Sequence, residues 1–258
     1  MGFETIQIDI SGGVATIRLD RPKVMNALNA QMRRDLVQAL TQGAREARAI
    51  VLTGNGDAFC AGQDLGEGIS FGDLDLERTL REEYEPLLKL IYDCPVPTVC
   101  AVNGAAAGAG ANLALAADIV IAAKSATFLE AFARIGLVPD AGGTYWLPRL
   151  VGRARALGMC LLAEPVTAGQ AMAWGLIWEA VDDEKLSARV GEIAQRLAVG
   201  PTVSHRLTKQ AIAASFQNDL QAQLELEARL QKQAGTTRDF REGVMAFLEK
   251  RPARYEGR

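Results

Sequence analysis

Two short apolar segments constrain the fold of this chain more than any other feature. Residues 49–53 and 98–102 lack the polar alternation of a half-exposed strand, and each precedes a loop rich in small residues. Such uninterrupted apolar strands are typical of parallel sheets that are buried on both faces. A third strand is expected at 118–122, and helical patterns separate the three. Strands that alternate with helices predict right-handed βαβ units, and therefore an α/β fold.

The rest of the chain continues this pattern. The first strands, 5–10 and 14–19, flank Gly12 and Gly13 and predict a hairpin, and Asn29 is a suitable N-cap for the helix that follows. Residues 54–72 are expected to form a glycine-rich loop, and the overlapping segment 66–75 is expected to line a binding pocket. Helices are predicted at 29–46, 76–92, 109–117, 154–162, 168–174, 183–199, 203–216 and 220–233. We expect one continuous domain, with a core over 1–200 and a helical region over 201–258.

Composition argues against several classes of function. The net charge of −3 gives no basic face for nucleic acid. The apolar stretch 104–123 has a length that could span a membrane, but it contains Asn112 and Asp118, so a buried helix and strand are expected. The four cysteines lack zinc spacing, and His205 is the single histidine, so no metal site is predicted. Without a secretory leader pattern, we expect a cytoplasmic protein.

Asp140 is the most informative single residue. It lies in an apolar segment, 135–148, and none of the four residues on either side is charged. A carboxylate in such surroundings is costly unless it has a function. Desolvation would raise its pKa and make it a better proton acceptor near neutral pH.

Two loops follow buried strands and carry runs of small residues, at 57–65 and 103–113. Glycine and alanine allow a ligand to approach the backbone closely. Main-chain N–H groups at the start of the helix after the second loop would attract developing negative charge. Close packing of helix on strand explains either loop alone. Two such loops, together with Asp140, favour an oxyanion hole.

Three segments resemble the motifs of the crotonase (enoyl-CoA hydratase/isomerase) superfamily. They are Phe59-Cys-Ala-Gly-Gln-Asp64, Ala101-Val-Asn-Gly-Ala-Ala-Ala-Gly-Ala-Gly110 and Gly136-Leu-Val-Pro-Asp-Ala-Gly-Gly143. The resemblance covers nearly the whole chain. It implies a spiral of ββα units, a helical C-terminal trimerisation region and acyl-CoA thioester substrates, with coenzyme A as part of the substrate and no further cofactor. A homotrimer or a dimer of trimers is expected.

The resemblance also assigns roles to residues. The main-chain N–H groups of Gln63 and Ala109 would hold a thioester enolate oxygen, although the family usually has glycine at the second position. Phe128 and Phe132 would wall the acyl pocket, with core packing as the alternative. Asp64 would bind substrate or, preferably, orient its own loop. The other positions that resemble substrate or CoA contacts are Lys23, Val24, Asn26, Ala27, Ala61, Leu65, Phe247 and Lys250.

The departures from the family pattern decide the expected reaction. The two glutamates that activate water in hydratases align with Asn112 and Phe132, neither of which can act as a base. Asp140 aligns with the catalytic aspartate of several isomerases and is left as the only well-placed base. Glu130 is the nearest preceding acid, but its orientation cannot be read from the sequence.

Within the superfamily, the motifs are most similar to those of ring-1,2-epoxyphenylacetyl-CoA isomerases of bacterial phenylacetate degradation. That similarity implies conversion of an arene-epoxide thioester to an oxepin thioester. A Δ3,Δ2-enoyl-CoA isomerase for linear chains, an enoyl-CoA hydratase and an inactive crotonase-like scaffold remain alternatives.

Overall fold

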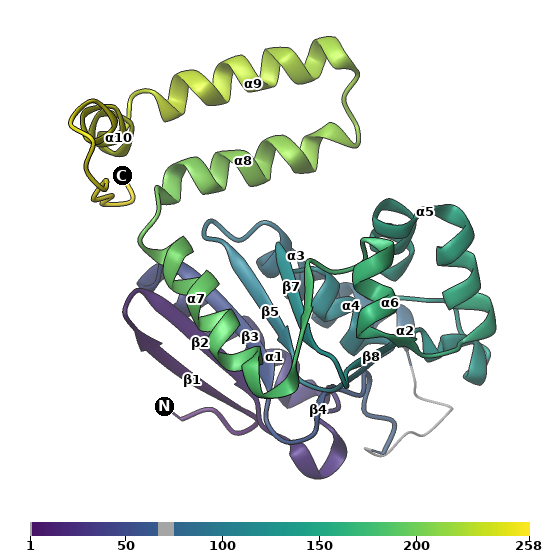
Figure 1. Ribbon diagram of the computed structural model, residues 1–258. Helices are drawn as coiled ribbons and strands as arrows, with labels where there is room; N and C mark the ends of the chain where they lie inside the picture. The colour runs from purple at the N-terminus through teal and green to yellow at the C-terminus, as the bar shows by residue number, and fades with distance from the viewer. Residues whose placement is uncertain (1, 67–74) are drawn as a thin grey trace.

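A computed structural model describes residues 2–66 and 75–258, and its centre is a six-stranded sheet (Figure 1). The strand order is β1-β2-β3-β5-β7-β10. Only the pair β1 and β2 is antiparallel, which confirms the predicted hairpin. The bounds are β1 Ile6–Ser11, β2 Val14–Leu19, β3 Ala49–Gly54, β5 Thr98–Val102, β7 Ile119–Ala123 and β10 Glu179–Val181. The predicted apolar strands β3 and β5 lie in the middle of the sheet and are buried.

A second sheet has the order β4-β6-β8-β9 and makes the fold a spiral. Its strands are β4 Ala58–Cys60, β6 Ala105–Ala107, β8 Thr127–Leu129 and β9 Val166–Thr167. β4, β6 and β8 directly follow β3, β5 and β7, so each turn of the chain contributes one strand to each sheet before a helix. The two regions that we expected to be plain loops, 54–72 and 103–113, therefore contain β4 and β6. Strands of three residues are too short for an alternating pattern to reveal them.

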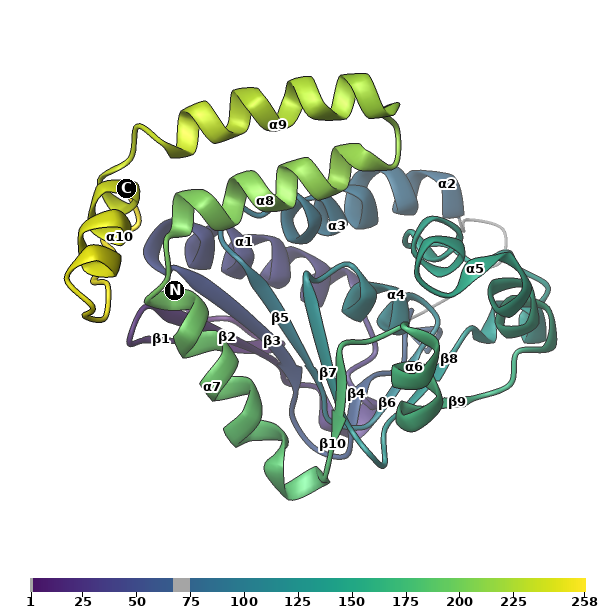
Figure 2. The same cartoon turned by 45° about the horizontal axis from the view of Figure 1, so that its top comes forward.

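Helices cover both faces of the large sheet. α1 (Ala30–Glu46) and α3 (Glu85–Tyr92) pack together on one face, and α7 (Leu186–Ala198) crosses the other (Figure 2). The side chain of Asn29 accepts a hydrogen bond from the Met32 N–H at 2.8 Å, which confirms it as the N-cap of α1.

The predicted helix 76–92 is divided by one wider turn. α2 (Leu76–Thr79) leads into a π-helical turn, η2 (Leu80–Tyr84), and α3 continues from it. Pro86 has no N–H to donate to the preceding turn, and the wider turn accommodates this. The π turn directs Tyr84 inward, where it is 3% exposed. The adjoining residues 67–74, most of the loop expected to line the pocket, lie outside the described part of the chain.

The helix after Asp140 begins earlier than predicted. α5 spans Gly143–Leu162, whereas the sequence pattern indicated a start at Ala154. Pro148 and a non-helical Gly152 interrupt it and obscure the pattern. This correction puts Asp140 three residues before the start of a helix. Other short helical elements before α7 are η1 Pro22–Val24, α4 Ala109–Leu115, η3 Ala131–Ile135, α6 Ala168–Trp174 and η4 Asp183–Lys185.

The C-terminal helices form a separate layer (Figure 1). α8 (Thr202–Ser215) and α9 (Leu220–Ala234) pack antiparallel, and α10 (Arg238–Leu248), which we did not predict as a separate helix, follows. Lys209 of α8 joins the layer to the sheet through an ion pair with Asp118 at 2.7 Å.

The apolar stretch 104–123 forms β6, α4 and β7, and most of its residues are buried. In the described ranges, 2–66 and 75–258, no helix combines the length and apolar character needed to cross a membrane.

Candidate active site

Asp140 lies in the loop between η3 and α5, and its carboxylate is largely desolvated. Its Oδ1 atom is buried and has no hydrogen-bond partner among the described residues. Burial raises the pKa of Asp140 to about 6. The neighbouring side chains of Leu137 and Val138 are apolar and exposed, so the loop itself supplies no cation to neutralise the charge. A carboxylate in this state is suited to accept a proton near neutral pH.

A tight turn fixes the main chain at Asp140. Ala141 and Gly142 both have positive φ, 48° and 83°, and the Gly143 N–H donates to the Asp140 carbonyl at 2.9 Å. The Asn112 Nδ2 atom donates to the same carbonyl, also at 2.9 Å. A Cβ atom at position 143 would lie 2.5 Å from Asn112 Nδ2, so this approach requires glycine. Asn112, which the sequence resemblance predicts to replace a hydratase glutamate, thus holds the Asp140 turn.

Glu130 is a second buried acid beside Asp140, and this corrects the expectation that Asp140 is the only well-placed carboxylate. The side chain lies at the end of β8 and is 1% exposed, with Oε2 3.3 Å from Asn112 Nδ2. Burial raises the pKa of Glu130 to about 7, and the charge of Asp140 adds to the rise. In the part of the chain that the structure describes, no cluster of three metal-binding side chains includes this pair.

The Gln63 N–H is oriented by a parallel bridge to Leu28. The Leu28 N–H donates to the Gly62 carbonyl at 2.7 Å, and the Asp64 N–H donates to the Leu28 carbonyl at 3.2 Å. In such a bridge, the middle residue points its own N–H away from the partner strand. Accordingly, no hydrogen bond within residues 2–66 and 75–258 uses the Gln63 N–H as donor.

The second predicted donor, Ala109, begins α4 next to the Gln63 loop. Its N–H is among the unpaired groups at the start of a helix, and it has no acceptor in the described ranges. Gly62, with φ of 90°, brings the two loops together: a Cβ atom there would lie 2.7 Å from the Ala107 carbonyl and 3.4 Å from the Ala109 nitrogen. Gly110 likewise allows the first turn of α4 to reach the Cys60 carbonyl, 2.4 Å from where a Cβ would lie. The two N–H groups predicted for an oxyanion hole therefore lie on adjoining loops, and neither has an acceptor within 2–66 and 75–258.

The two residues predicted to wall the acyl pocket, Phe128 and Phe132, lie in different surroundings. Phe132 lies in η3, and its ring is 3.6 Å from the position a Cβ would take on Gly108, the residue before Ala109. Phe132 is thus placed beside the two loops. Phe128 is 0% exposed within β8, so its ring belongs to the protein core, and the prediction that it walls the pocket is wrong.

The residues expected to contact CoA near the first loop also differ in their surroundings. Lys23 and Val24 are exposed on η1, and Leu65 is 55% exposed. Asn26 is 0% exposed, because its amide accepts from the Arg21 N–H and donates to the carbonyls of Asn55 and Ala58. The prediction that Asn26 contacts CoA is therefore wrong for this structure. Ala27 is 7% exposed, and the Ala61 N–H donates to the Met25 carbonyl at 2.9 Å.

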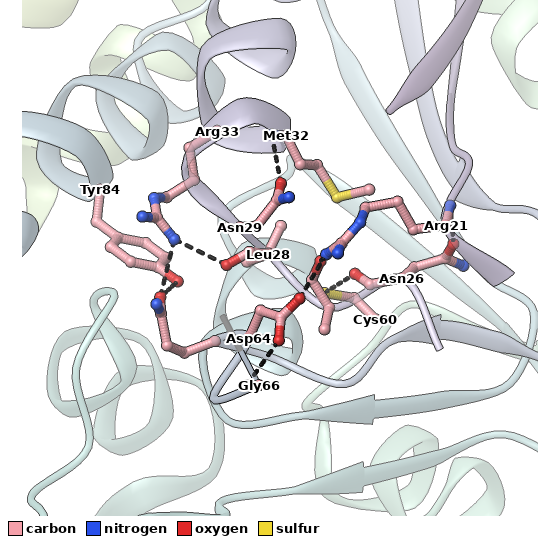
Figure 3. Close-up of polar contacts among 12 residues, drawn as sticks. Arg21, Asn26, Leu28, Asn29, Met32, Arg33, Cys60, Asp64, Gly66 and Tyr84 are labelled. Carbon is pink, nitrogen blue, oxygen red and sulfur yellow. Dashed lines mark hydrogen bonds and ion pairs between the residues drawn. The ribbon is translucent and has the colours of Figure 1, made fainter. Parts of the chain in front are cut away.

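Asp64 holds its own loop, as the preferred alternative for it predicted. Arg21 Nη1 donates to one carboxylate oxygen at 2.7 Å, and the Gly66 N–H donates to the other at 2.9 Å (Figure 3). Burial opposes ionisation, but these hydrogen bonds lower the pKa of Asp64 below its usual range. Asp64 is therefore an ionised anchor for the loop that carries Gln63.

Phe247 and Lys250 do not meet Asp140 within one chain. Phe247 is 83% exposed on α10, and Lys250 follows that helix. α10 lies at the opposite end of the molecule from α5 in both views (Figures 1 and 2).

The sequence reasoning missed Arg33 and Tyr84, which hold the Gln63 side chain. Arg33 Nη1 donates to Gln63 Oε1 at 2.9 Å, and the Tyr84 hydroxyl donates to the same oxygen (Figure 3). Arg33 is only 4% exposed. The available indication was Arg33 itself, because it is a charged residue on the apolar face of the predicted helix 29–46.

Comparisons with known proteins agree with this architecture. The sequence model of the enoyl-CoA hydratase/isomerase family matches residues 9–258. The chain therefore belongs to the crotonase superfamily and has its fold.

Two relatives match along their whole length. A Rhodobacter capsulatus protein named "Probable enoyl-CoA hydratase" is 61% identical, over 100% of both chains. The 1,2-epoxyphenylacetyl-CoA isomerase of Escherichia coli is 46% identical, over 99% of this chain and 100% of the isomerase. Among solved structures, an enoyl-CoA hydratase from Bacillus anthracis superposes with a TM-score of 0.91 at 33% identity, over 99% and 100% of the two chains. The chain is thus an enzyme of the crotonase family, and an acyl-CoA substrate fits that family.

Proposed function

We propose that this enzyme is an acyl-CoA isomerase in which Asp140 is the proton carrier. The observation that supports this most strongly is the buried Oδ1 atom of Asp140, together with the N–H groups of Gln63 and Ala109, none of which has a hydrogen-bond partner among the residues that the structure describes. Asp140 would take a proton from the carbon next to the thioester. The two N–H groups would stabilise the enolate oxygen that forms. The proton would return at another carbon, so that substrate and product are isomers.

The proposed substrate is a ring-1,2-epoxyphenylacetyl-CoA, and the product an oxepin-CoA. Loss of the α-proton gives an enolate, and its electrons open the epoxide before ring expansion. The identity of 46% with the Escherichia coli 1,2-epoxyphenylacetyl-CoA isomerase supports this choice. The ring of Phe132 beside Gly108 would suit a cyclic acyl group.

Hydration of an enoyl-CoA is the second candidate. The 61% identical relative is named a hydratase, and Glu130 places a second acid beside Asp140. Against it, Asn112 and Phe132 occupy the positions of the water-activating glutamates, and Glu130 is 1% exposed. A Δ3,Δ2-enoyl-CoA isomerase for linear chains would use the same proton transfer, and an inactive scaffold would have no use for a buried Asp140.

Asp140→Asn tests the proposal because it removes the base and keeps the shape. A carboxylate base contributes ~10²–10⁴-fold to the rate. We expect kcat for ring-epoxide and 3-enoyl thioesters to fall by that factor, with the unfolding midpoint retained. Turnover near the wild-type rate in a folded variant would reject the proposal. Comparison of the two substrates in the wild type distinguishes the two isomerase activities.

We further propose a cytoplasmic homotrimer or dimer of trimers. The apolar residues exposed on the C-terminal layer, such as Leu220, Phe240 and Leu248, support self-association. Light scattering measures the mass directly. A monomer at micromolar concentration would contradict this part of the proposal.

A further inference from the structure

Two hydrogen-bond donors from outside its loop hold the side chain of Gln63. Arg33 comes from α1, and Tyr84 comes from the π turn before α3. Both donate to the single oxygen Oε1 of Gln63 (Figure 3). A glutamine side chain that only faced solvent would form its hydrogen bonds with water, whereas Oε1 of Gln63 accepts from two buried donors. This arrangement therefore fixes one rotamer of Gln63 and, with it, the main chain at that residue.

Arg33 also fixes the strand segment opposite Gln63. The same Nη1 atom that binds Gln63 donates to the Leu28 carbonyl at 2.8 Å. Leu28 is the bridge partner that brackets Gln63 from the other side. One guanidinium therefore holds both members of the bridge that directs the Gln63 N–H.

The two donors are themselves fixed. Glu83 accepts from Arg33 Nε and Nη2, each at 2.8 Å, and the Arg33 guanidinium lies 5.0 Å from the centre of the Tyr84 ring. Both side chains are almost fully buried, at 4% and 3% exposure. Burial raises the pKa of Tyr84, and the charge of Asp140 adds to the rise, so the hydroxyl stays protonated and remains a donor.

We propose that Arg33 and Tyr84 are positioning residues that set the orientation of the Gln63 N–H through the Gln63 side chain. This inference rests on the proposed oxyanion role of that N–H. An oxyanion donor acts only when it points to where the negative charge develops. Without these side-chain hydrogen bonds, only the main-chain bridge to Leu28 would hold the Gln63 N–H, and its direction would be less firmly fixed. Binding of the CoA portion would then persist while stabilisation of the enolate would fall.

A bound chromophore reports on the N–H orientation without turnover. In 3-phenylpropenoyl-CoA the carbonyl is conjugated with an aromatic ring, and there is no γ-proton for an isomerase to move. Hydrogen bonds to the carbonyl oxygen shift its absorption to longer wavelength. We expect a red shift on binding to the wild type, and a shift reduced by half or more in Tyr84→Phe with Kd changed less than threefold. Tyr92→Phe removes a hydroxyl near Tyr145, 3.3 Å away, and is the matched control that keeps the full shift.

A double-mutant cycle separates positioning from general stabilisation. With a substrate that turns over, Tyr84→Phe is expected to lower kcat ~10-fold with KM little changed, less than the ~10²–10³-fold loss of a whole oxyanion donor. In a Gln63→Met background, which lacks the acceptor, the same Tyr84→Phe change should lower kcat less than twofold further.

The outcomes distinguish this inference from the proposed function. A wild-type red shift that Tyr84→Phe leaves intact overturns the positioning role alone. A wild-type complex with no red shift overturns the oxyanion hole and the positioning role together. A full effect of Tyr84→Phe in the Gln63→Met background also overturns the inference, because the hydroxyl would then act by another route.

Discussion

The Asn112 amide donates to the main-chain carbonyl of Asp140 at 2.9 Å. Asn112, at the position predicted to correspond to a water-activating glutamate of hydratases, thus carries a side chain that holds the proposed base. Asn112 is 0% exposed, and its Nδ2 atom also approaches Glu130. An amide at position 112 cannot act as a base, which is consistent with the proposed proton transfer by Asp140.

Asn112→Ala should weaken both the fold and the reaction. It removes a donor from a buried site, which typically costs ~1–3 kcal/mol of unfolding free energy. It also frees the Asp140 turn, so kcat should fall more than KM rises. Urea unfolding and steady-state kinetics measure the two effects. Asn218→Ala, which breaks a side-chain contact with Gln223 in the C-terminal layer, is the control and should leave kcat unchanged.

The pH dependence of kcat/KM should report the ionisation of Asp140. Because the base must be ionised and burial raises its pKa to about 6, kcat/KM should fall as the pH decreases through about 6. A profile from pH 4.5 to pH 8 is the measurement. Constant kcat/KM down to pH 4.5 would show that no carboxylate with a raised pKa serves as the base.

Glu130→Gln should change how stability depends on pH. Burial raises the pKa of Glu130 to about 7 from its usual 4.5, so between these values the unfolded chain releases a proton that the native state retains. The wild type therefore loses stability from this group as the pH rises from 4.5 to 7, by about 1.4 kcal/mol per unit of pKa difference. Relative to the wild type, Glu130→Gln should gain stability over that window. The free energy of unfolding of the variant and of the wild type would be measured at pH 5 and at pH 8. A difference between the two proteins that is the same at both pH values would contradict a raised pKa for Glu130.

Gly62→Ala should damage the oxyanion hole. Position 62 has a φ of 90°, and a Cβ there would lie 2.7 Å from the Ala107 carbonyl, so the Gln63 and Ala109 loops must move apart. We expect kcat to fall ~10²-fold or more, as when one oxyanion donor is lost. Gly158→Ala is the control, since that helical position has no atom within 4 Å of the added Cβ, and it should leave kcat unchanged.

Periodicity revealed the long elements and missed the features that shape the site. The apolar strands β3 and β5 and the helix capped by Asn29 follow from local pattern, because burial and capping depend on nearby residues. β4 and β6 are too short to carry a pattern, and their partners lie in other turns of the spiral. Pro148 and Gly152 concealed the first part of α5, and the predicted helix 154–162 corresponds to the part that follows the break in the helical backbone at Gly152.

The site was partly predictable for the same physical reason. Asp140 stands out by its isolation from other charges, and the small-residue loops indicate where N–H donors could lie. Gln63 and Ala109 within those loops were assigned only through the resemblance to the crotonase superfamily. Arg33, Tyr84 and Glu130 approach the site from α1, η2 and β8, and no spacing in the sequence shows that their side chains converge. The burial of Asn26 and Phe128 is likewise set by contacts with distant segments.

The mass of the product tests the central claim most directly, because it separates movement of a proton from addition of water. A ring-1,2-epoxyphenylacetyl-CoA and a 3-enoyl-CoA would each be converted in water enriched in oxygen-18, and the products weighed by mass spectrometry. We predict products with the same mass as their substrates and no oxygen-18, formed by the wild type and not by Asp140→Asn. A product heavier by one molecule of labelled water, formed as fast as or faster than any isomer, would contradict the account.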